Sequence, residues 1–362
     1  MNSGNVRPLR HADLEALAEL RLRCFRHGRY RDRTALAKHF ESVFLDNPWL
    51  DTGVQALVYE DGHGRVLGFR GLVGRPMQFR GKSLVAAISS QFMVDPEARS
   101  EGVAFALMRA SLSGPQEIMI ADLANPAAKK LWGMIRGVEI TELALQWRRP
   151  LTPMRWMAGR LGSSPSLIWS LRLARPILFG LDKLAASIPE GPFRPCRKPA
   201  MEPVSVKQHA ELLNQLTQRY ELVPDYHHES LAWTLDMLAE GLKADEQLVA
   251  RRVVDQTDGS SGFFLAVVQP GGVTSVLQLG AASSGIEATM AGLLHTAAIH
   301  HCREVTGRLQ PEFLPQLATP PGCLTLSGPR VMVATRRPEL LDCLCSGKAW
   351  LTRLEGEWWM GF

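Results

Sequence analysis

The sequence is poor in cysteine, and no cysteine pattern is typical of a zinc site or a redox pair. The six cysteines include no C-x-x-C spacing, and the close pair Cys343 and Cys345 has no histidine at zinc-site spacing. We therefore expect reduced, mostly buried thiols and no metal. The consecutive His227 and His228 do not alter this expectation, because adjacent side chains ahead of a helix usually point in different directions.

Long apolar runs are also missing. No stretch of eighteen uncharged apolar residues occurs, and the N-terminal MNSGNVRPLRHAD lacks the apolar centre of a signal peptide. These two absences predict a cytoplasmic protein. The hydrophobic content of 46% is typical of a folded chain, and a length of 362 residues favours two domains over one core.

Acidic residues are scarce in the first 200 residues relative to basic ones. Residues 151–200 carry 8 Lys+Arg against 2 Asp+Glu, residues 1–150 carry 21 against 16, and residues 201–362 carry 12 against 18. This asymmetry is expected if anionic ligands bind to the first part of the chain, although a solvated basic surface would show it too. The basic residues are not interleaved with enough aromatic ones to indicate a nucleic-acid partner.

The most informative stretch predicts a strand, a tight loop and a helix. Residues 86–94 have the apolar character of a buried strand, residues 95–101 are polar and contain Pro96, and residues 102–112 have helical apolar spacing. The first amides of a helix have no partner within it, so such a loop is suited to an anion such as a pyrophosphate. Gly102 lets the backbone approach the anion, and Arg99 adds a charged donor.

The same stretch carries a family motif. Arg99-Ser100-Glu101-Gly102-Val103-Ala104 resembles the (Gln/Arg)-x-x-Gly-x-(Gly/Ala) signature of the GNAT (GCN5-related N-acetyltransferase) acyltransferases. A second GNAT motif, Asn-x-x-Ala-x-x-Leu-Tyr-x-x-x-Gly-Phe, follows at the right distance. The residues that match it are Asn125, Ala128, Leu131, Trp132 and Gly137. The chain therefore resembles this superfamily in two ordered motifs on suitable elements.

The resemblance implies a fold, a co-substrate and a reaction. Acetyl-CoA or another acyl-CoA would bind at the loop, and its acyl group would pass directly to an amine or hydroxyl. The residues expected to bind it are Phe92, Met93, Val94, Arg99, Ser100, Glu101, Gly102, Val103, Ala104, Asn125 and Trp132. An enzyme of this kind works mainly by positioning and by polarising the thioester carbonyl, so it needs few ionisable residues.

The sequence departs from the family at the catalytic positions. Trp132 stands where many members have a tyrosine that protonates the leaving thiolate, and an indole cannot supply its proton at neutral pH. Ser90 lies on the strand where some relatives place a glutamate base. We name Ser90 and Asp122 as the catalytic candidates, and the alternative for Asp122 is that it caps the following turn.

The acceptor site is predicted from an arginine-rich segment, RLRCFRHGRYRDR, at residues 21–33. In the GNAT family this region forms the floor or lip of the acceptor site. Arg26, Arg29 and Tyr30 would then bind an anionic small molecule, such as a nucleotide-sugar or a polysaccharide precursor, or an acyl carrier protein that brings the donor. A solvated helix face that is rich in arginine would explain the same residues.

The remaining elements predict an α/β fold of two GNAT-like domains, each a mixed, mainly antiparallel sheet flanked by helices. The first domain spans 1–150, with hairpin strands at 54–60, 66–73 and 76–79 and a closing strand at 139–148. Residues 151–200 form a basic helical connector and a proline-rich linker. Residues 201–362 repeat the order of elements without the signature, contain strand structure at 323–335 and end in the strand LTRLEGEWW.

Two functions from different classes follow. The first is an acyl-CoA-dependent acyltransferase, in which the second domain shapes the acceptor site or a homodimer. The second is a non-catalytic GNAT scaffold that senses acyl-CoA or docks on an acyl carrier protein or a membrane. Residues 154–183 would make the membrane contact, because a basic amphipathic helix with tryptophan can lie on an anionic surface. A helical connector is the interpretation that we prefer for that segment.

Overall fold

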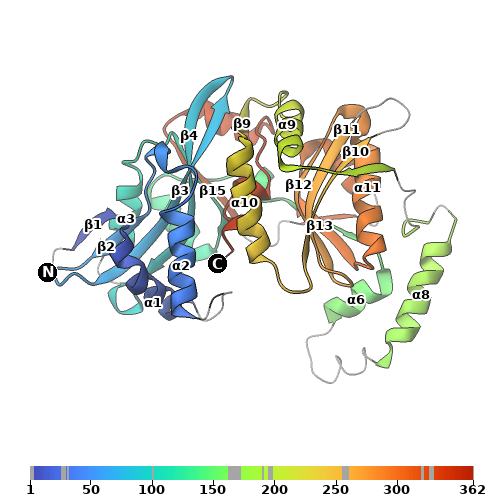
Figure 1. Ribbon diagram of the computed structural model, residues 1–362, viewed down its shortest axis with the longest axis horizontal. Helices are drawn as coiled ribbons and strands as arrows, with labels where there is room; N and C mark the ends of the chain where they lie inside the picture. The colour runs from blue at the N-terminus through green and yellow to red at the C-terminus, as the bar shows by residue number, and fades with distance from the viewer. Residues whose placement is uncertain are drawn as a thin grey trace. The chain divides into compact units, whose positions relative to one another are not determined.

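The chain forms two compact units, each containing one sheet flanked by helices (Figure 1). A computed structural model describes residues 4–25, 30, 32–99, 102–161, 173–189, 191–194, 199–254, 261–318, 322–325 and 330–361. Both sheets are mixed and mainly antiparallel, which confirms the predicted fold class.

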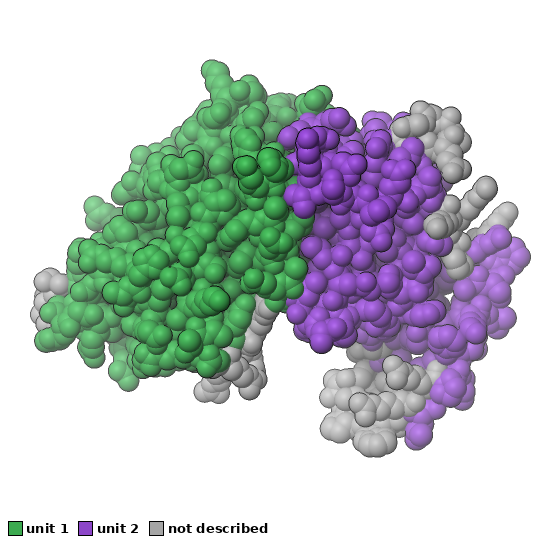
Figure 2. Space-filling view, viewed as in Figure 1, with its two compact units in different colours: residues 1–144, 217–241, 328–362 green, residues 145–216, 242–327 purple. Residues whose placement is uncertain are grey.

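Neither unit is a single stretch of sequence (Figure 2). The first unit contains residues 1–144, 217–241 and 328–362, and the second contains residues 145–216 and 242–327. The units therefore alternate along the chain, whereas the sequence patterns delimited contiguous ranges. Strand pairing between distant segments causes the alternation, and local patterns carry no information about such pairing.

The sheet of the first unit has the order β1-β2-β3-β4-β5-β15-β6, and β9 pairs with part of β3. Its pairs are antiparallel except for β4 with β5, which are parallel and joined through a helix. The strands are β1 (Asn5–Pro8), β2 (Leu57–Glu60), β3 (Val66–Phe79), β4 (Lys82–Val94), β5 (Ile118–Ala124), β6 (Val138–Glu139), β9 (Leu222–Pro224) and β15 (Arg330–Thr335).

Capped amphipathic segments form the helices of this unit. Asp32 and Asn125 each accept a hydrogen bond from a first-turn amide, as N-cap residues do. The helices are α1 (Leu14–Cys24), α2 (Arg33–Phe44), α3 (Val103–Ser111), α4 (Pro126–Met134), α5 (Thr141–Ala144), α10 (His228–Gly241) and α13 (Pro338–Cys345). The predicted helix at 102–112 is confirmed in α3.

Three strand predictions are wrong. The strands predicted at 66–73 and 76–79 are one strand, β3. The predicted closing strand at 139–148 does not join β5, because residues 146–150 form β7 of the second sheet. The strand structure predicted at 323–335 is confirmed as two strands, β14 and β15, which lie in different sheets. LTRLEGEWW forms two 3-10 turns rather than a strand, since Glu355 accepts hydrogen bonds from Thr352 and closes a capping box.

The second unit repeats this topology, with the order β14-β7-β13-β12-β11-β10-β8 and one parallel pair, β12 with β13. Its strands are β7 (Gln146–Pro150), β8 (Ala200–Pro203), β10 (Gln247–Val254), β11 (Ser261–Val268), β12 (Val273–Ala281), β13 (Glu304–Arg308) and β14 (Cys323–Thr325). Its helices are α6 (Pro153–Leu161), α8 (Arg175–Ser187), α9 (Val206–Leu216), α11 (Ile286–Ile299) and α12 (Leu314–Ala318).

Each sheet contains one strand that comes from a distant part of the sequence. β15, near the C-terminus, lies between β5 and β6 in the first sheet. β7, which directly follows the first continuous stretch of unit 1, lies between β13 and β14 in the second sheet. In each sheet, the strand beside the parallel pair is therefore supplied by a segment far along the sequence from that pair.

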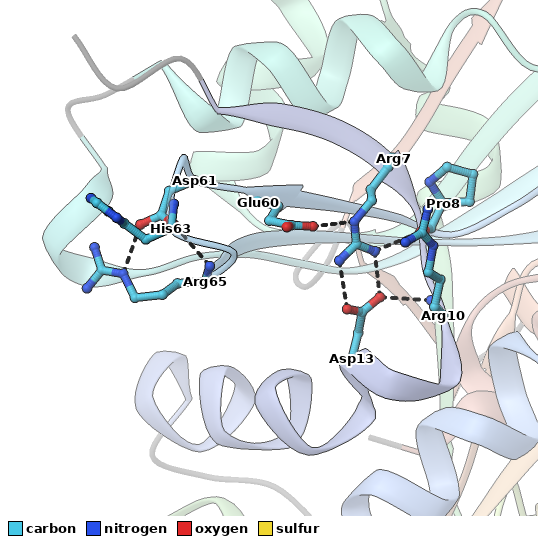
Figure 3. Close-up of polar contacts among 8 residues, drawn as sticks. All are labelled: Arg7, Pro8, Arg10, Asp13, Glu60, Asp61, His63 and Arg65. Carbon is cyan, nitrogen blue, oxygen red and sulfur yellow. Dashed lines mark hydrogen bonds and ion pairs between the residues drawn. The ribbon is translucent and has the colours of Figure 1, made fainter.

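An arginine on the first strand fixes the edge of the first sheet to α1 (Figure 3). Arg7 forms a bidentate pair with Asp13 at 2.7 and 2.8 Å and also bonds Glu60 of β2. The Arg10 amide donates to the Asp13 carboxylate at 2.9 Å. Burial acts to raise the pKa of Asp13, but these donors outweigh it and the pKa lies below its usual value. The pair therefore stabilises the fold when Asp13 is ionised.

We expect Asp13→Asn to destabilise the protein by about 1–3 kcal/mol at neutral pH, because Arg7 loses a charged partner. A carboxyl whose pKa is lower in the folded state stabilises above its unfolded pKa of about 3.9, and this contribution is lost as pH falls. The deficit of the variant should therefore shrink in denaturant titrations at acid pH. Glu15→Gln, an exposed first-turn change on α1, is the control and should shift stability by less than about 0.5 kcal/mol. A deficit that does not depend on pH would contradict this account.

Candidate active-site cavity

The two parallel strands of the first sheet separate after a short paired stretch. β4 and β5 pair only from Ala86 to Ile88 and from Ile118 to Ile120. Beyond this, β4 continues to Val94 and β5 to Ala124 without pairing to each other. One backbone edge of β4 therefore has no strand partner where the two strands part.

A β-bulge lies on each strand just beyond the point of separation. Gln91 and Phe92 of β4 together oppose the single residue Arg70 of β3, and Gln91 has a φ of 45°. Asp122 and Leu123 of β5 together oppose a single residue of β15. A bulge bends its strand and increases the local twist, so the pair of bulges directs the two strands apart.

A cavity of about 570 Å³ occupies this gap. Eight predicted site residues line it: Ser90, Phe92, Met93, Val94, Arg99, Ala104, Asn125 and Trp132. They come from β4, the following loop, α3 and α4, which the sequence placed together through the two motifs. Ser90 is buried, and its hydroxyl has no hydrogen-bond partner among the residues that the structure describes.

The start of α3 lies at one end of the cavity. Gly102 is the N-cap residue with a φ of 76°, a conformation that favours glycine, and no atom lies within 4 Å of the place where a Cβ would be. Arg99 lines the cavity and is exposed, whereas Arg23 pairs with Asp95 at 2.9 Å. Val103 is buried against the sheet and does not face the cavity. Ser100 and Glu101 lie outside the described residues.

The second motif forms one wall. The Asn125 side chain accepts a hydrogen bond from the Ala128 amide at 2.9 Å and so begins α4. Trp132 is 2% exposed and faces the cavity. A Cβ on Gly137 would lie 2.9 Å from Trp132, which explains why a glycine follows the helix there. This motif therefore fixes the position of an apolar wall.

An unpredicted arginine also lines the cavity. Arg70 is 1% exposed, and its guanidinium lies 5.3 Å from the Phe92 ring centroid and 5.4 Å from that of Trp132. Its Nη2 donates to the Met119 sulfur at 3.3 Å. Its Nε has no hydrogen-bond partner in the described part of the chain. Burial lowers the pKa of Arg70 to about 9, so it remains charged at neutral pH.

An unpredicted glutamate reaches the cavity from the C-terminal segment. The half-buried Glu357 lines it, and the Leu123 amide donates to Glu357 Oε1 at 3.1 Å. The Glu357 amide donates to Asp122 Oδ1 at 2.8 Å, and only a glycine fits at position 356 because a Cβ there would lie 1.9 Å from Asp122. Burial and the Asp122 charge raise the pKa of Glu357 well above its usual value.

Besides Val103, the predicted site residues Asp122 and Tyr30 do not line the cavity. Asp122 is buried, is not among the residues lining the cavity in the described ranges, and accepts the Glu357 amide. Tyr30 contacts His39, with ring centroids 4.5 Å apart and a hydroxyl-to-Nδ1 distance of 3.2 Å. Tyr30 is likewise absent from the lining among described residues. Arg26 and Arg29 lie outside the described residues.

The corresponding junction of the second unit is built differently. There β12 leads through Ser283–Gly285 into α11, and no arginine or lysine occurs between Val273 and Ile299. On β12, the buried Gln278 contacts His209 Nε2 of α9 at 2.9 Å. Burial lowers the pKa of His209 to about 4, so this contact involves a neutral imidazole at neutral pH. A neutral pair of side chains, Gln278 and His209, therefore joins β12 to α9.

Within the described residues, no group of three His, Cys, Asp or Glu side chains is arranged to hold a metal ion. The same part of the chain contains no helix that is long and apolar enough to cross a membrane.

Comparison with solved structures identifies the fold. The chain is similar to a GCN5-related N-acetyltransferase from Anabaena variabilis, with a TM-score of 0.58 and 15% identity over 93% of this chain and 74% of that one. A GCN5-related N-acetyltransferase from Kribbella flavida has a TM-score of 0.57 and 15% identity over 92% and 71%. No family model and no curated protein matches the sequence. The chain has the GNAT fold that its two motifs predicted.

We expect Glu357→Gln to raise the melting temperature at pH 8 by about 2–4 °C, equivalent to about 1 kcal/mol. A carboxyl whose pKa is raised by folding destabilises the protein as pH rises from its unfolded pKa of about 4.3 through the folded value. The glutamine can still accept the Leu123 amide. The gain should disappear near pH 4. Glu339→Gln is the opposite control, because Arg337 lowers the pKa of Glu339 and its loss should not stabilise. A stabilisation of Glu357→Gln that is equal at both pH values would sink the argument.

Proposed function

We propose that the chain is an acyltransferase that passes an acyl group directly from acyl-CoA to an amine or hydroxyl of a small anionic acceptor. The separation of β4 from β5 carries the proposal, because it opens one cavity to both an anion-binding helix start and an unpaired strand edge. The GNAT fold supports the same class.

The residues fit the donor at both of its chemical parts. The first amides of α3 and the Arg99 guanidinium are suited to a pyrophosphate. The unpaired edge of β4 near Phe92 and Met93 offers backbone groups to an amide-containing arm, as an edge strand does to a peptide. We therefore assign the diphosphate to the Arg99 end and the pantetheine arm to β4.

The reaction needs a proton acceptor and a donor. In the proposed step the acceptor nitrogen or oxygen bonds the thioester carbon, its proton passes to a base, and the carbon–sulfur bond breaks to release a thiolate. Glu357 is our choice of base, because it lines the cavity and because burial and the Asp122 charge raise its pKa, which makes its carboxylate a stronger base. Asp122, the base candidate named from the sequence, does not line the cavity, and its charge instead raises the pKa of Glu357. The Ser90 hydroxyl lines the cavity and has no hydrogen-bond partner among the described residues. We assign it to donate a hydrogen bond to the leaving thiolate, in place of the tyrosine of many GNAT members.

Arg99→Glu should raise the Kd for acetyl-CoA at least about tenfold, which corresponds to about 1.4 kcal/mol, because it replaces a cation that lines the cavity with an anion. Arg109→Glu is the matched control, since Arg109 is exposed in the last turn of α3 and does not line the cavity. Isothermal titration calorimetry with acetyl-CoA measures both. Equal affinities of the wild type and Arg99→Glu for acetyl-CoA would show that the diphosphate does not bind at the Arg99 end of the cavity.

A second candidate function is attachment to an anionic membrane surface, and an exposed stripe on α8 favours it. Ile177, Leu181, Leu184 and Ile188 are 67%, 45%, 64% and 52% exposed and recur at helical spacing on one face. Asp182 accepts bonds from the Met154 amide and Arg155, which ties the other face to α6. Because residues 151–200 carry a net charge of +6, we commit to anionic lipid as the occupant.

Co-sedimentation with vesicles tests this attachment. The wild type should sediment with phosphatidylglycerol-containing vesicles and less with pure phosphatidylcholine, and Leu184→Asp should reduce binding about tenfold or more. Leu50→Asp, at another exposed leucine, should leave it unchanged. No sedimentation with anionic vesicles excludes the lipid surface. A dimer that dissociates on Leu184→Asp would assign the stripe to a second copy of the chain.

A further inference from the structure

Arg70 is a buried cation that has no anionic partner among the residues that the structure describes. No carboxylate of the described residues lies within ion-pair distance of its guanidinium, and its Nε is unpaired. The contacts that it does make are a thioether and two aromatic faces. Burying an unpaired charge is costly, so a ligand anion that pairs with Arg70 would recover part of that cost. Because Arg70 lines the cavity, a ligand in the cavity can be that partner.

Glu357 supplies the opposite charge on the same cavity. The two groups affect each other electrostatically, yet they do not form an ion pair in the described chain. A ligand that lies between them meets a planar guanidinium on β3 and a carboxylate next to β5. One group on that ligand must be an acceptor of hydrogen bonds, and another must be a donor.

We propose that Arg70 binds the carboxylate of the acceptor and that Glu357 accepts a hydrogen bond from its amine. The acceptor is then an amino acid or a similar small aminocarboxylic acid. The inference rests on the proposed acyl transfer and narrows its acceptor. A carboxylate matches the fork of one guanidinium, and an ammonium matches Glu357, so the occupied cavity gains no net charge. A phosphate dianion would leave excess negative charge beside Glu357.

The size of the cavity supports the same class. About 570 Å³ must hold the reactive end of the donor together with the acceptor. Drug-sized ligands alone occupy pockets of roughly 300–1,000 Å³, so a nucleotide-sugar leaves little space for the pantetheine arm. An amino acid fits beside it. The sequence predicted an anionic acceptor. We narrow that class to carboxylic acids whose carboxylate binds Arg70 of β3.

Arg75 provides a matched control on the same strand. It is 4% exposed, its Nε and Nη1 have no hydrogen-bond partner among described residues, and it lies 4.5 Å from the Trp49 ring centroid. Arg75 is not among the cavity-lining residues in the described chain. Arg75→Met and Arg70→Met therefore remove the same charge at similar burial, but only the second removes it from the cavity.

Paired acceptors test the proposal through CoA release from acetyl-CoA. The pairs are L-phenylalanine with phenethylamine, L-serine with ethanolamine and L-lysine with cadaverine. The wild type should prefer at least one amino acid over its decarboxylated partner by about 100-fold or more in kcat/KM, because a buried donor is left unpaired by the analogue. Arg70→Met should abolish this preference, mainly by raising KM for the amino acid. Arg75→Met should retain the preference.

The outcomes separate this inference from the proposed function. Acyl transfer to amines without any carboxylate preference, or a preference for phosphorylated amines that survives Arg70→Met, overturns the amino-acid acceptor and leaves the acyltransferase. Loss of the phenethylamine reaction with Arg70→Met would also overturn it, because the arginine would then act on the shared chemistry. Failure of the wild type to bind acetyl-CoA overturns both. Should Arg70→Met not fold, calorimetry of wild type saturated with CoA decides: the preferred amino acid must bind at least about tenfold more tightly than its methyl ester.

Discussion

The separation of two parallel strands is the constraint on which the first unit depends. A paired sheet satisfies its backbone groups, and a protein rarely leaves such groups buried without partners. Here β4 and β5 part after three paired residues each, and bulges on both strands keep them apart. The backbone edge that this leaves, the helix start beside it and the charges of Arg70 and Glu357 all face one cavity. The geometry of the site is therefore a property of the sheet itself.

The cavity combines an apolar wall with charges that are expensive to bury. Phe92 and Trp132 lie against the Arg70 guanidinium, and an aromatic face offsets part of the loss of water around a cation. Glu357 keeps one bond from a backbone amide, while the nearby Asp122 opposes its ionisation. Buried charges of this kind lower the stability of the protein without a ligand, but they can bind and polarise a ligand, as is common at functional sites.

Much of the fold and one half of the site could be predicted, because their signals are local. The strand, loop and helix around Gly102 follow from apolar spacing, a glycine with positive φ and a nearby arginine, and all lie within about thirty residues. The other half is not local. Glu357 meets Asp122 across 235 residues, so no window of sequence contains both. Arg70 is one of two arginines in a mainly apolar strand, and that pattern alone does not reveal what its side chain contacts.

The positions of β7 and β15 in the two sheets govern how the chain must be made. A ribosome delivers β5 about two hundred residues before β15, its neighbour in the sheet. During that interval one edge of β5 is open, and an open strand edge is a template for pairing with other chains. Closing such long loops also slows folding. The nascent polypeptide therefore passes through a long period of vulnerability to aggregation, and its production in cells should depend on chaperones and on the speed of translation more than its finished architecture suggests.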